Sequence, residues 1–208
     1  MKKEKETNLG TIFKHGKIVA LPSLKNTGKT NNLVSMIKQL RDTGNNTPIY
    51  TYGFPEELQK YLKKTLKCKI VSSLKQIKKL KNAILICDEF QQLRLNDRRH
   101  RDDLMDFTAK VYHNNLHVIL SSPNIREFNS VIGSVIEVWC LKTVNLDECI
   151  NGSQLKKAVN DYKGTYKVGR DIVVGKGMII LDVVDEELVL SCEYLEMADT
   201  KKKLLKLF

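Results

Sequence analysis

The chain has 208 residues, 42% of them apolar and 28% charged, a balance that is typical of globular proteins and excludes a disordered or collagen-like chain. Lysine and arginine number 35 against 24 acidic residues, and the formal net charge of +11 favours polyanionic partners such as nucleic acid. No apolar run is long enough to span a membrane, and residues 1–8 lack the pattern of a secretory signal. These features predict an intracellular, cytoplasmic protein without a membrane span.

Short apolar runs alternate with amphipathic helical patterns along the first two thirds of the chain. Strands are predicted at Lys17–Pro22, Pro48–Tyr52, Lys69–Ser72, Ala83–Cys87, Leu116–Leu120 and Val135–Thr143. Helices are predicted at Lys29–Asp42, Glu56–Leu66, Leu74–Leu80, Asp97–His113 and, more briefly, Ile125–Ile132. This order indicates right-handed crossovers and an α/β fold with a mostly parallel sheet covered by helices on both faces.

The last third of the chain departs from this rhythm. A helix is predicted at Gln154–Tyr162, and the β-rich runs Met178–Val184 and Leu188–Tyr194 predict an antiparallel hairpin at the edge of the sheet. We expect a single domain over residues 1–208, with an N-terminal extension at 1–14 and a basic C-terminal tail at 196–208.

A phosphate-binding loop is indicated between the first strand and the first helix. Residues 23–30 (S-L-K-N-T-G-K-T) match the pattern G-x-x-x-x-G-K-[ST], except that Ser23 replaces the first glycine. In such a loop, backbone N–H groups and the positive end of the helix cradle phosphate oxygens. The residues predicted to bind the nucleotide are Ser23, Lys25, Asn26, Thr27, Gly28, Lys29, Thr30 and Asn31.

Three residues of this loop have distinct expected roles. Lys29 would neutralise the β- and γ-phosphates and act in catalysis, and Thr30 would supply a hydroxyl to Mg²⁺. Ser23 carries a Cβ that glycine lacks, which is costly if the entry turn needs a positive φ. A chance G-K-T is the alternative, but the strand before it and the helix after it favour a true phosphate loop.

The predicted strand Ala83–Cys87 ends in two carboxylates, Asp88 and Glu89. At the carboxyl end of a buried parallel strand, Asp88 would face the phosphate loop and hold Mg²⁺, directly or through water. Glu89 would act as the general base that polarises an attacking water. An acid at a strand end is common, and the pair gains its significance from the phosphate loop upstream.

The strand Leu116–Leu120 also ends in polar residues, namely Ser121, Ser122 and Asn124. Their position suits a residue that senses the γ-phosphate or the attacking water, and Ser122 is placed among the expected catalytic residues. Ordinary turn chemistry before a helix is an equally good interpretation of each one.

Arginines offer candidates for completing the site of a neighbouring subunit. Arg126 and Arg170 are isolated, and either would serve as an arginine finger, although a plain surface role is the simpler interpretation of each. A second group lies beside Asp102 and Asp103, where a salt-bridged helix face is favoured: Arg94, Arg98, Arg99 and Arg101.

Taken together, these motifs resemble the RecA-like P-loop NTPases with an additional central strand, and in particular the FtsK/HerA superfamily with its compact viral genome-packaging ATPases. The similarity lies in residues 23–30 (Walker A), in I-L-I-C-D-E at Ile84–Glu89 (Walker B) and in the polar-ended strand Leu116–Ser122. The resemblance implies a three-layer fold, ATP and Mg²⁺ as cofactors, and a homo-oligomeric ring, with a hexamer as the expected form. It also implies double-stranded DNA as the partner and a capsid or portal-like protein as a second one.

The function expected on this basis is ATP hydrolysis coupled to DNA translocation, as in DNA packaging by a virus or mobile element. Such a protein would act in the host cytoplasm or with the virion. Lysine-rich stretches at Lys60–Lys69 and Lys75–Lys81 would line a DNA channel, or they form ordinary solvated helix faces. The alternatives are a non-translocating P-loop ATPase that acts as a switch or loader and, less favoured, a small-molecule kinase.

Overall fold

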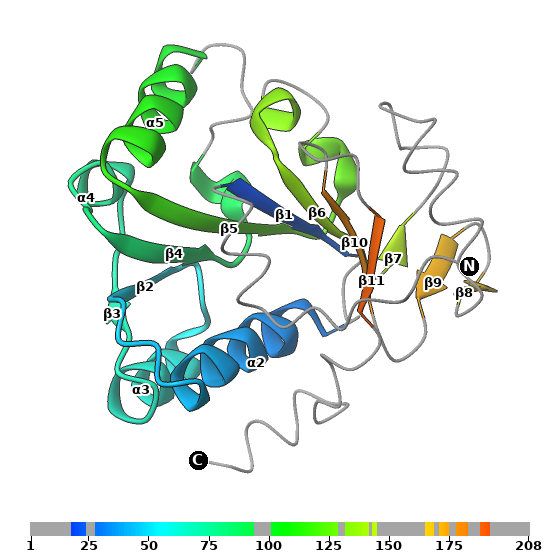
Figure 1. Cartoon of the computed structure of the whole chain (residues 1–208), viewed down its shortest axis with the longest axis horizontal. Coiled ribbons are helices and arrows are strands. Elements are labelled where there is room, and N and C mark those ends of the chain that lie inside the picture. The colour runs from blue at the N-terminus through cyan, green and yellow to red at the C-terminus, as the bar shows by residue number, and fades with distance from the viewer. Residues whose placement is uncertain are drawn as a thin grey trace.

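The computed structural model describes residues 18–23, 28–93, 101–128, 132–141, 143–144, 165–168, 171–174, 178–182 and 188–191 (Figure 1). An eight-stranded sheet with the order β11-β10-β6-β1-β5-β4-β2-β3 forms the centre. Its strands are β1 (Ile18–Pro22), β2 (Ile49–Tyr52), β3 (Lys69–Ile70), β4 (Ala83–Cys87), β5 (Leu116–Ser122), β6 (Val138–Leu141), β10 (Met178–Asp182) and β11 (Leu188–Ser191). The six strands from β6 to β3 run parallel, whereas β10 and β11 are antiparallel additions at one edge.

Helices cover both faces of this sheet, which gives three layers (Figure 1). On one face, α2 (Lys29–Asp42) and α3 (Glu56–Lys64) pack against alternate strand residues such as Leu21 and Ile86. On the other face, α4 (Leu74–Ile77) and α5 (Arg101–His113) pack against the intervening residues, such as Ala20 and Leu85. Strands β1 and β4 are buried at every position, as expected for parallel strands covered on both sides.

The order of the central strands matters for the site. Strand β5 lies between β1 and β4 and is parallel to both, so the strand before the phosphate loop does not pair with the strand that precedes Asp88. Because parallel strands end at the same edge of a sheet, the carboxyl ends of β1, β5 and β4 stand side by side in that order. Ser121, in β5, therefore lies between the phosphate loop and the acidic pair.

A row of aromatic side chains lies directly behind this edge. Phe90, in the 3₁₀ helix η1 (Phe90–Leu93), packs on Phe128 with ring centroids 4.6 Å apart. Phe128 meets Trp139 of β6 edge-on at 5.7 Å. Phe90 and Phe128 are fully buried, and Trp139 is nearly so. The row joins the segment after Glu89 to the turn after β5.

The α/β architecture, the parallel sheet and the edge hairpin are confirmed, and α2 and β4 have the predicted bounds. α3 ends at Lys64, short of the predicted Leu66, because Lys67 adopts a left-handed φ of 54° that stops the helix. β5 continues to Ser122, two residues beyond its predicted end. Two predicted helices are shorter than expected: Leu74–Leu80 ends at Ile77, and Ile125–Ile132 is a 3₁₀ turn, η3 (Ile125–Glu127).

The predicted strand Val135–Thr143 is divided. Its first residue closes the 3₁₀ helix η4 (Ile132–Val135), β6 follows, and β7 (Thr143–Val144) joins a second, three-stranded sheet with the order β7-β9-β8. The other two strands of that sheet, β8 (Thr165–Val168) and β9 (Asp171–Val174), were not predicted. The predicted helix Gln154–Tyr162, the extension 1–14 and the tail 196–208 lie outside the described residues. Within the part of the chain that the structure describes, every helix is too short or too polar to cross a membrane.

Candidate functional site

The start of α2 is built to receive an anion. Gly28 occupies the position before the helix with a left-handed φ of 88°, which glycine adopts without strain, and its carbonyl accepts the N–H of Asn32 at 2.9 Å. No side chain caps this end, and the first turn contains no acidic residue. The N–H groups of the first turn and the positive end of a 14-residue helix therefore favour a negatively charged group.

Thr30 and Asp88 meet at the carboxyl edge of the sheet, as their sequence positions predicted. The Thr30 hydroxyl donates to Asp88 Oδ2 at 2.6 Å. The second carboxylate oxygen, Oδ1, accepts the hydroxyl of Ser121 at 2.7 Å. Two hydroxyls, one from α2 and one from β5, thus fix both oxygens of the same carboxylate.

The environment of Asp88 sets its proton affinity. Asp88 is only 3% exposed, and this burial raises the pKa of its carboxyl group above the ordinary value. The hydrogen bonds from Thr30 and Ser121 and the positive charge of Lys29 act in the opposite direction, while the charge of Glu89 adds to the rise. Lys29 itself is 8% exposed, so this residue is also largely withdrawn from solvent.

Glu89 follows with an unusual backbone. Its φ of 56° lies in the left-handed region, which is strained for a residue with a side chain. Its N–H donates to the Ser121 hydroxyl at 3.3 Å, and its carboxylate Oε2 accepts Gln92 Nε2 at 3.1 Å. Ser121 therefore contacts both acidic residues, one through the carboxylate and one through the backbone.

Gly53 supports this arrangement from the next strand, and sequence analysis missed it. It follows β2 with a φ of 76°, and a Cβ placed there would lie 1.9 Å from the carbonyl oxygen of Asp88. Only glycine permits this approach, because any side chain would push the acidic segment away. The available signal was an isolated glycine directly after a predicted strand, which marks a turn or a close backbone contact.

Ser23 and Ser122 lie close together, joined through their backbones. The N–H of Ser23 donates to the carbonyl of Ser122 at 3.0 Å and continues the pairing of β1 with β5. The Ser122 hydroxyl accepts the N–H of Asn124 at 3.3 Å, and Asn124 in turn caps η3 by accepting the N–H of Arg126. The structure brings Ser121 rather than Ser122 to Asp88, and a catalytic role for Ser122 stays a prediction.

The remaining candidates are placed as follows. Asn31 is buried on α2, and Arg126 is exposed on η3. Arg101 opens α5. Several candidates lie outside the described residues: Lys25, Asn26, Thr27, Arg94, Arg98, Arg99 and Arg170.

Thr30, Asp88 and the start of α2 fit a nucleotide with its Mg²⁺. A hydroxyl and a carboxylate oxygen converge at 2.6 Å beside an uncapped helix end, and Mg²⁺ prefers such hard oxygen ligands together with phosphate oxygens. Among the described residues, no group of three or more His, Cys, Asp or Glu could hold a metal by itself.

In sequence, the chain matches no protein-family model and no curated protein. In structure, it is similar to the genome packaging NTPase B204 from Sulfolobus turreted icosahedral virus 2 in complex with AMPPCP. The TM-score is 0.60 at 14% identity, over 84% of this chain and 96% of that chain. The fold is that of a P-loop NTPase.

Two further solved structures share this P-loop fold. The pCW3 conjugation coupling protein TcpA matches 94% of this chain and 66% of its own, with a TM-score of 0.55 at 12% identity. The Type VII secretion ATPase EccC from Thermomonospora curvata matches 86% of this chain and 24% of its own, with a TM-score of 0.52 at 12% identity. The resemblance to FtsK/HerA-type P-loop ATPases is thereby confirmed at the level of the fold.

Proposed function

We propose that this P-loop protein hydrolyses ATP with Mg²⁺ and uses the energy to move double-stranded DNA. The observation that carries the ATPase part is the Thr30–Asp88 contact at 2.6 Å, next to Lys29 and the open N-terminus of α2. It joins the two motifs that the sequence predicted would share a nucleotide, across 58 residues of chain.

The residues divide the chemistry among them. Backbone N–H groups at the start of α2 bind phosphate oxygens, and Lys29 neutralises their charge. Thr30 and Asp88 would hold Mg²⁺, which would supply charge stabilisation to the transferring phosphoryl group. Ser121 keeps the Asp88 carboxylate in one orientation, and Glu89 accepts a proton from the attacking water through its carboxylate.

The motor part of the proposal draws on charge and on structural likeness. The net charge of +11 suits a protein that grips a phosphate backbone without reading bases. Similar folds occur in a genome packaging NTPase and in a conjugation coupling protein. We propose a homo-oligomeric ring, with Arg126 or Arg170 reaching the nucleotide of the next subunit, and a role in DNA packaging with a capsid or portal partner, in the cytoplasm or at the virion.

ATP turnover with and without duplex DNA tests both parts. We expect Mg²⁺-dependent hydrolysis that duplex DNA stimulates, in a ring that light scattering detects when ATP is present. Lys29→Ala should abolish productive binding or turnover, whereas Lys38→Ala, on the exposed side of the same helix, should leave both unchanged. Glu89→Gln should keep ATP binding and slow hydrolysis by about 10²–10⁴-fold, because the water loses its base.

The outcomes separate the parts of the proposal. Absence of nucleotide binding in titration calorimetry with Mg²⁺ would overturn the ATPase. Turnover that ignores duplex DNA, in a protein that stays monomeric or dimeric, would overturn the motor and favour a switch or loader.

A further inference from the structure

The positive charge of the chain is concentrated in one segment. Between Leu58 and Lys81 there are nine lysines and no acidic residue, so this segment carries nine of the eleven net charges. The rest of the chain, nearly nine tenths of its length, is almost neutral. A general adaptation for solubility would spread the charge and mix its signs.

The fold gathers these lysines at one edge of the molecule. Figure 1 shows β3 at the edge of the main sheet opposite β11, with α3 and α4 beside this edge on the two faces of the sheet. The lysines at 60, 63 and 64 lie on the exposed side of α3, opposite the buried Leu58 and Leu62, and Lys67 follows at the end of the helix. We name the basic face by its eight exposed lysines: Lys60, Lys63, Lys64, Lys67, Lys69, Lys75, Lys79 and Lys81.

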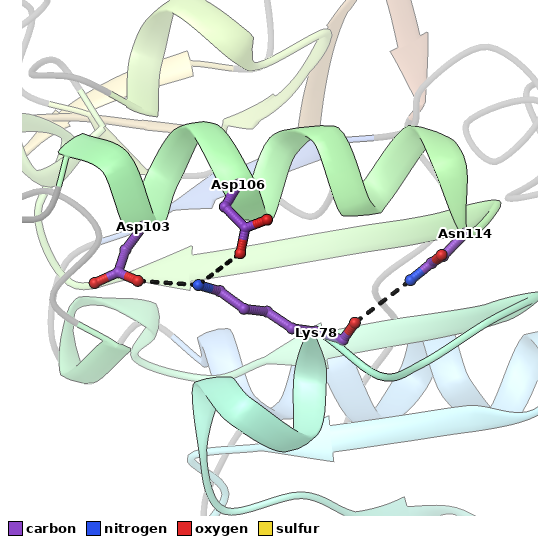
Figure 2. A network of polar contacts seen from close by, with 4 residues as sticks. All are labelled: Lys78, Asp103, Asp106 and Asn114. Carbon is purple, nitrogen blue, oxygen red and sulfur yellow. Dashed lines mark hydrogen bonds and ion pairs between the residues drawn. The ribbon is translucent and has the colours of Figure 1, made fainter.

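Lys78 is the ninth lysine and behaves differently. Its ammonium group forms ion pairs with Asp103 at 2.9 Å and with Asp106 at 2.8 Å, and Asn114 holds its backbone carbonyl (Figure 2). These contacts bind the segment after α4 to α5. Lys78 also borders a shallow groove of about 390 Å³, whose other lining residues are Leu74, Lys75, Lys79 and Asp103.

The eight lysines of the basic face are not neutralised in this way. Among the residues that the structure describes, no ion pair joins them to a carboxylate. Lys67 donates to the carbonyl of Lys64, and Lys69 lies over the ring of Tyr50 at 5.5 Å. Glu56 and Glu57 lie in the first turn of α3, and Asp103 and Asp106 are engaged by Lys78.

Such an arrangement works against stability. Lysines four apart, such as Lys60 and Lys64, repel each other on a helix. Protection of the edge strand β3 against aggregation would need one or two charges, not eight. A bound polyanion turns this repulsion into attraction and releases its own counterions.

We propose that the basic face binds the phosphate backbone of double-stranded nucleic acid. Lysine is a point charge that contacts phosphates without the planar fork that reads bases, so binding should not depend on sequence. An anionic membrane or an acidic protein is less well matched, because each would use an apolar anchor. In the described part of the chain, the large exposed apolar residues are Met105 and Tyr112, on α5 and not on this face.

This inference deepens the proposed function by naming the surface that grips the partner, and it can fail separately. The basic face lies at the β3 edge, and β2 separates β3 from β4, the strand that precedes Asp88. Binding at this face therefore needs no nucleotide and can be measured without it.

Fluorescence anisotropy with a labelled 30-base-pair DNA duplex, in the absence of nucleotide and over a series of salt concentrations, tests the proposal. Lys63→Gln/Lys64→Gln should weaken binding by about tenfold or more near 100 mM salt and reduce the salt slope by about 2. The control Lys38→Gln/Lys110→Gln removes two exposed lysines from α2 and α5 and should change neither. Lys63→Arg/Lys64→Arg should restore wild-type binding, because it restores the charge.

Further arms define what would overturn the proposal. If Lys63→Gln/Lys64→Gln lowers the affinity for a DNA duplex of unrelated sequence, or for an RNA duplex, by the same factor, recognition of the backbone would be supported. If the control Lys38→Gln/Lys110→Gln weakens DNA binding as much as Lys63→Gln/Lys64→Gln does, only net charge matters, and the proposal for the basic face would be overturned. Binding of phosphatidylserine vesicles or polyglutamate through this face, with no loss of duplex binding in the variant, would also overturn it. If the basic face binds DNA but the protein does not hydrolyse ATP, the proposed motor function would be overturned, whereas the DNA-binding role of the basic face would stand.

Discussion

Two regions of this molecule treat charge in opposite ways. At the carboxyl ends of β1, β5 and β4, one buried carboxylate is held by hydroxyls from two elements. At the basic face, eight exposed lysines face solvent without an ion pair in the described part of the chain. A buried charge fixes geometry and costs stability. An exposed charge contributes little by itself, but many exposed charges together produce a strong electrostatic field.

The largest effect should come from the tightest contact of the buried region. In Gly53→Ala, a methyl group would meet the carbonyl of Asp88, and the free energy of unfolding should fall by about 3 kcal/mol or more, measured in urea. Gly44→Ala is the matched control, because Gly44 shares the φ of 76° but a Cβ added there would have no atom within 4 Å.

In Gly44→Ala, the free energy of unfolding should fall by only about 1 kcal/mol, the cost of placing a residue with a Cβ in the left-handed backbone conformation. Equal losses for the two variants would mean that the approach of Gly53 to Asp88 contributes nothing beyond backbone conformation. Nucleotide affinity should fall in Gly53→Ala and not in Gly44→Ala, because only the first displaces the acidic segment.

Ser121→Ala removes one of the two hydroxyls on Asp88. A hydrogen bond to a buried charged group contributes about 2 kcal/mol, and its loss should raise the pKa of Asp88 further, since Ser121 is one of the groups that lower it. The acid limb of the pH profile for ATP turnover should therefore move to higher pH. Ser122→Ala, at the next fully buried position, should leave the profile in place; a shift in Ser122→Ala alone would reverse the two roles.

Asp88→Asn should exchange function for stability. Burial raises the pKa of Asp88 in the folded protein, so its contribution to stability is present at low pH and is lost as the pH rises through that pKa. At pH 7, the ligand-free variant should be more stable than the wild type by about 1 kcal/mol, and this gain should shrink as the pH falls. Thermal melts at several pH values, without Mg²⁺ or nucleotide, measure it; a gain that grows toward acid pH would contradict the assignment.

The smallest effects belong to the basic edge. Lys78→Gln breaks the two ion pairs to α5 and should lower the free energy of unfolding by less than about 1 kcal/mol, because its partners are half-exposed. Lys79→Gln, the exposed neighbour, should be neutral. High salt should reduce the difference between the two. An equal loss in both variants would show that the ion pairs add no stability.

Much of the fold and part of the site could be predicted from local patterns. The strand–loop–helix sequence around residues 23–30 defined α2, and the apolar run 83–87 defined β4. Strong periodicity and buried runs carry such information within a few residues. Strands β8 and β9 are four residues each and contain lysine and aspartate, so they gave no comparable signal.

The contacts within the site depended on register, which local patterns do not specify. Cys87 pairs with Leu120, so the next position along the two strands sets Asp88 beside Ser121 and turns Ser122 away. The approach of Gly53 to Asp88 likewise depends on how β2 and β4 align. The sequence therefore predicted which strand ends meet and that Thr30 and Asp88 come together, but not that Ser121 and Gly53 contact Asp88.

The aromatic row behind the site has a mechanical consequence. Phe90 follows Glu89 directly, and Phe128 lies two residues after Arg126. In a close-packed interior, one ring cannot shift without displacing its neighbour. A rotation of the Glu89 backbone out of its strained conformation would thus slide Phe90 against Phe128 and carry the turn of Arg126 with it, so that the Glu89 carboxylate and the exposed Arg126 side chain would change position together.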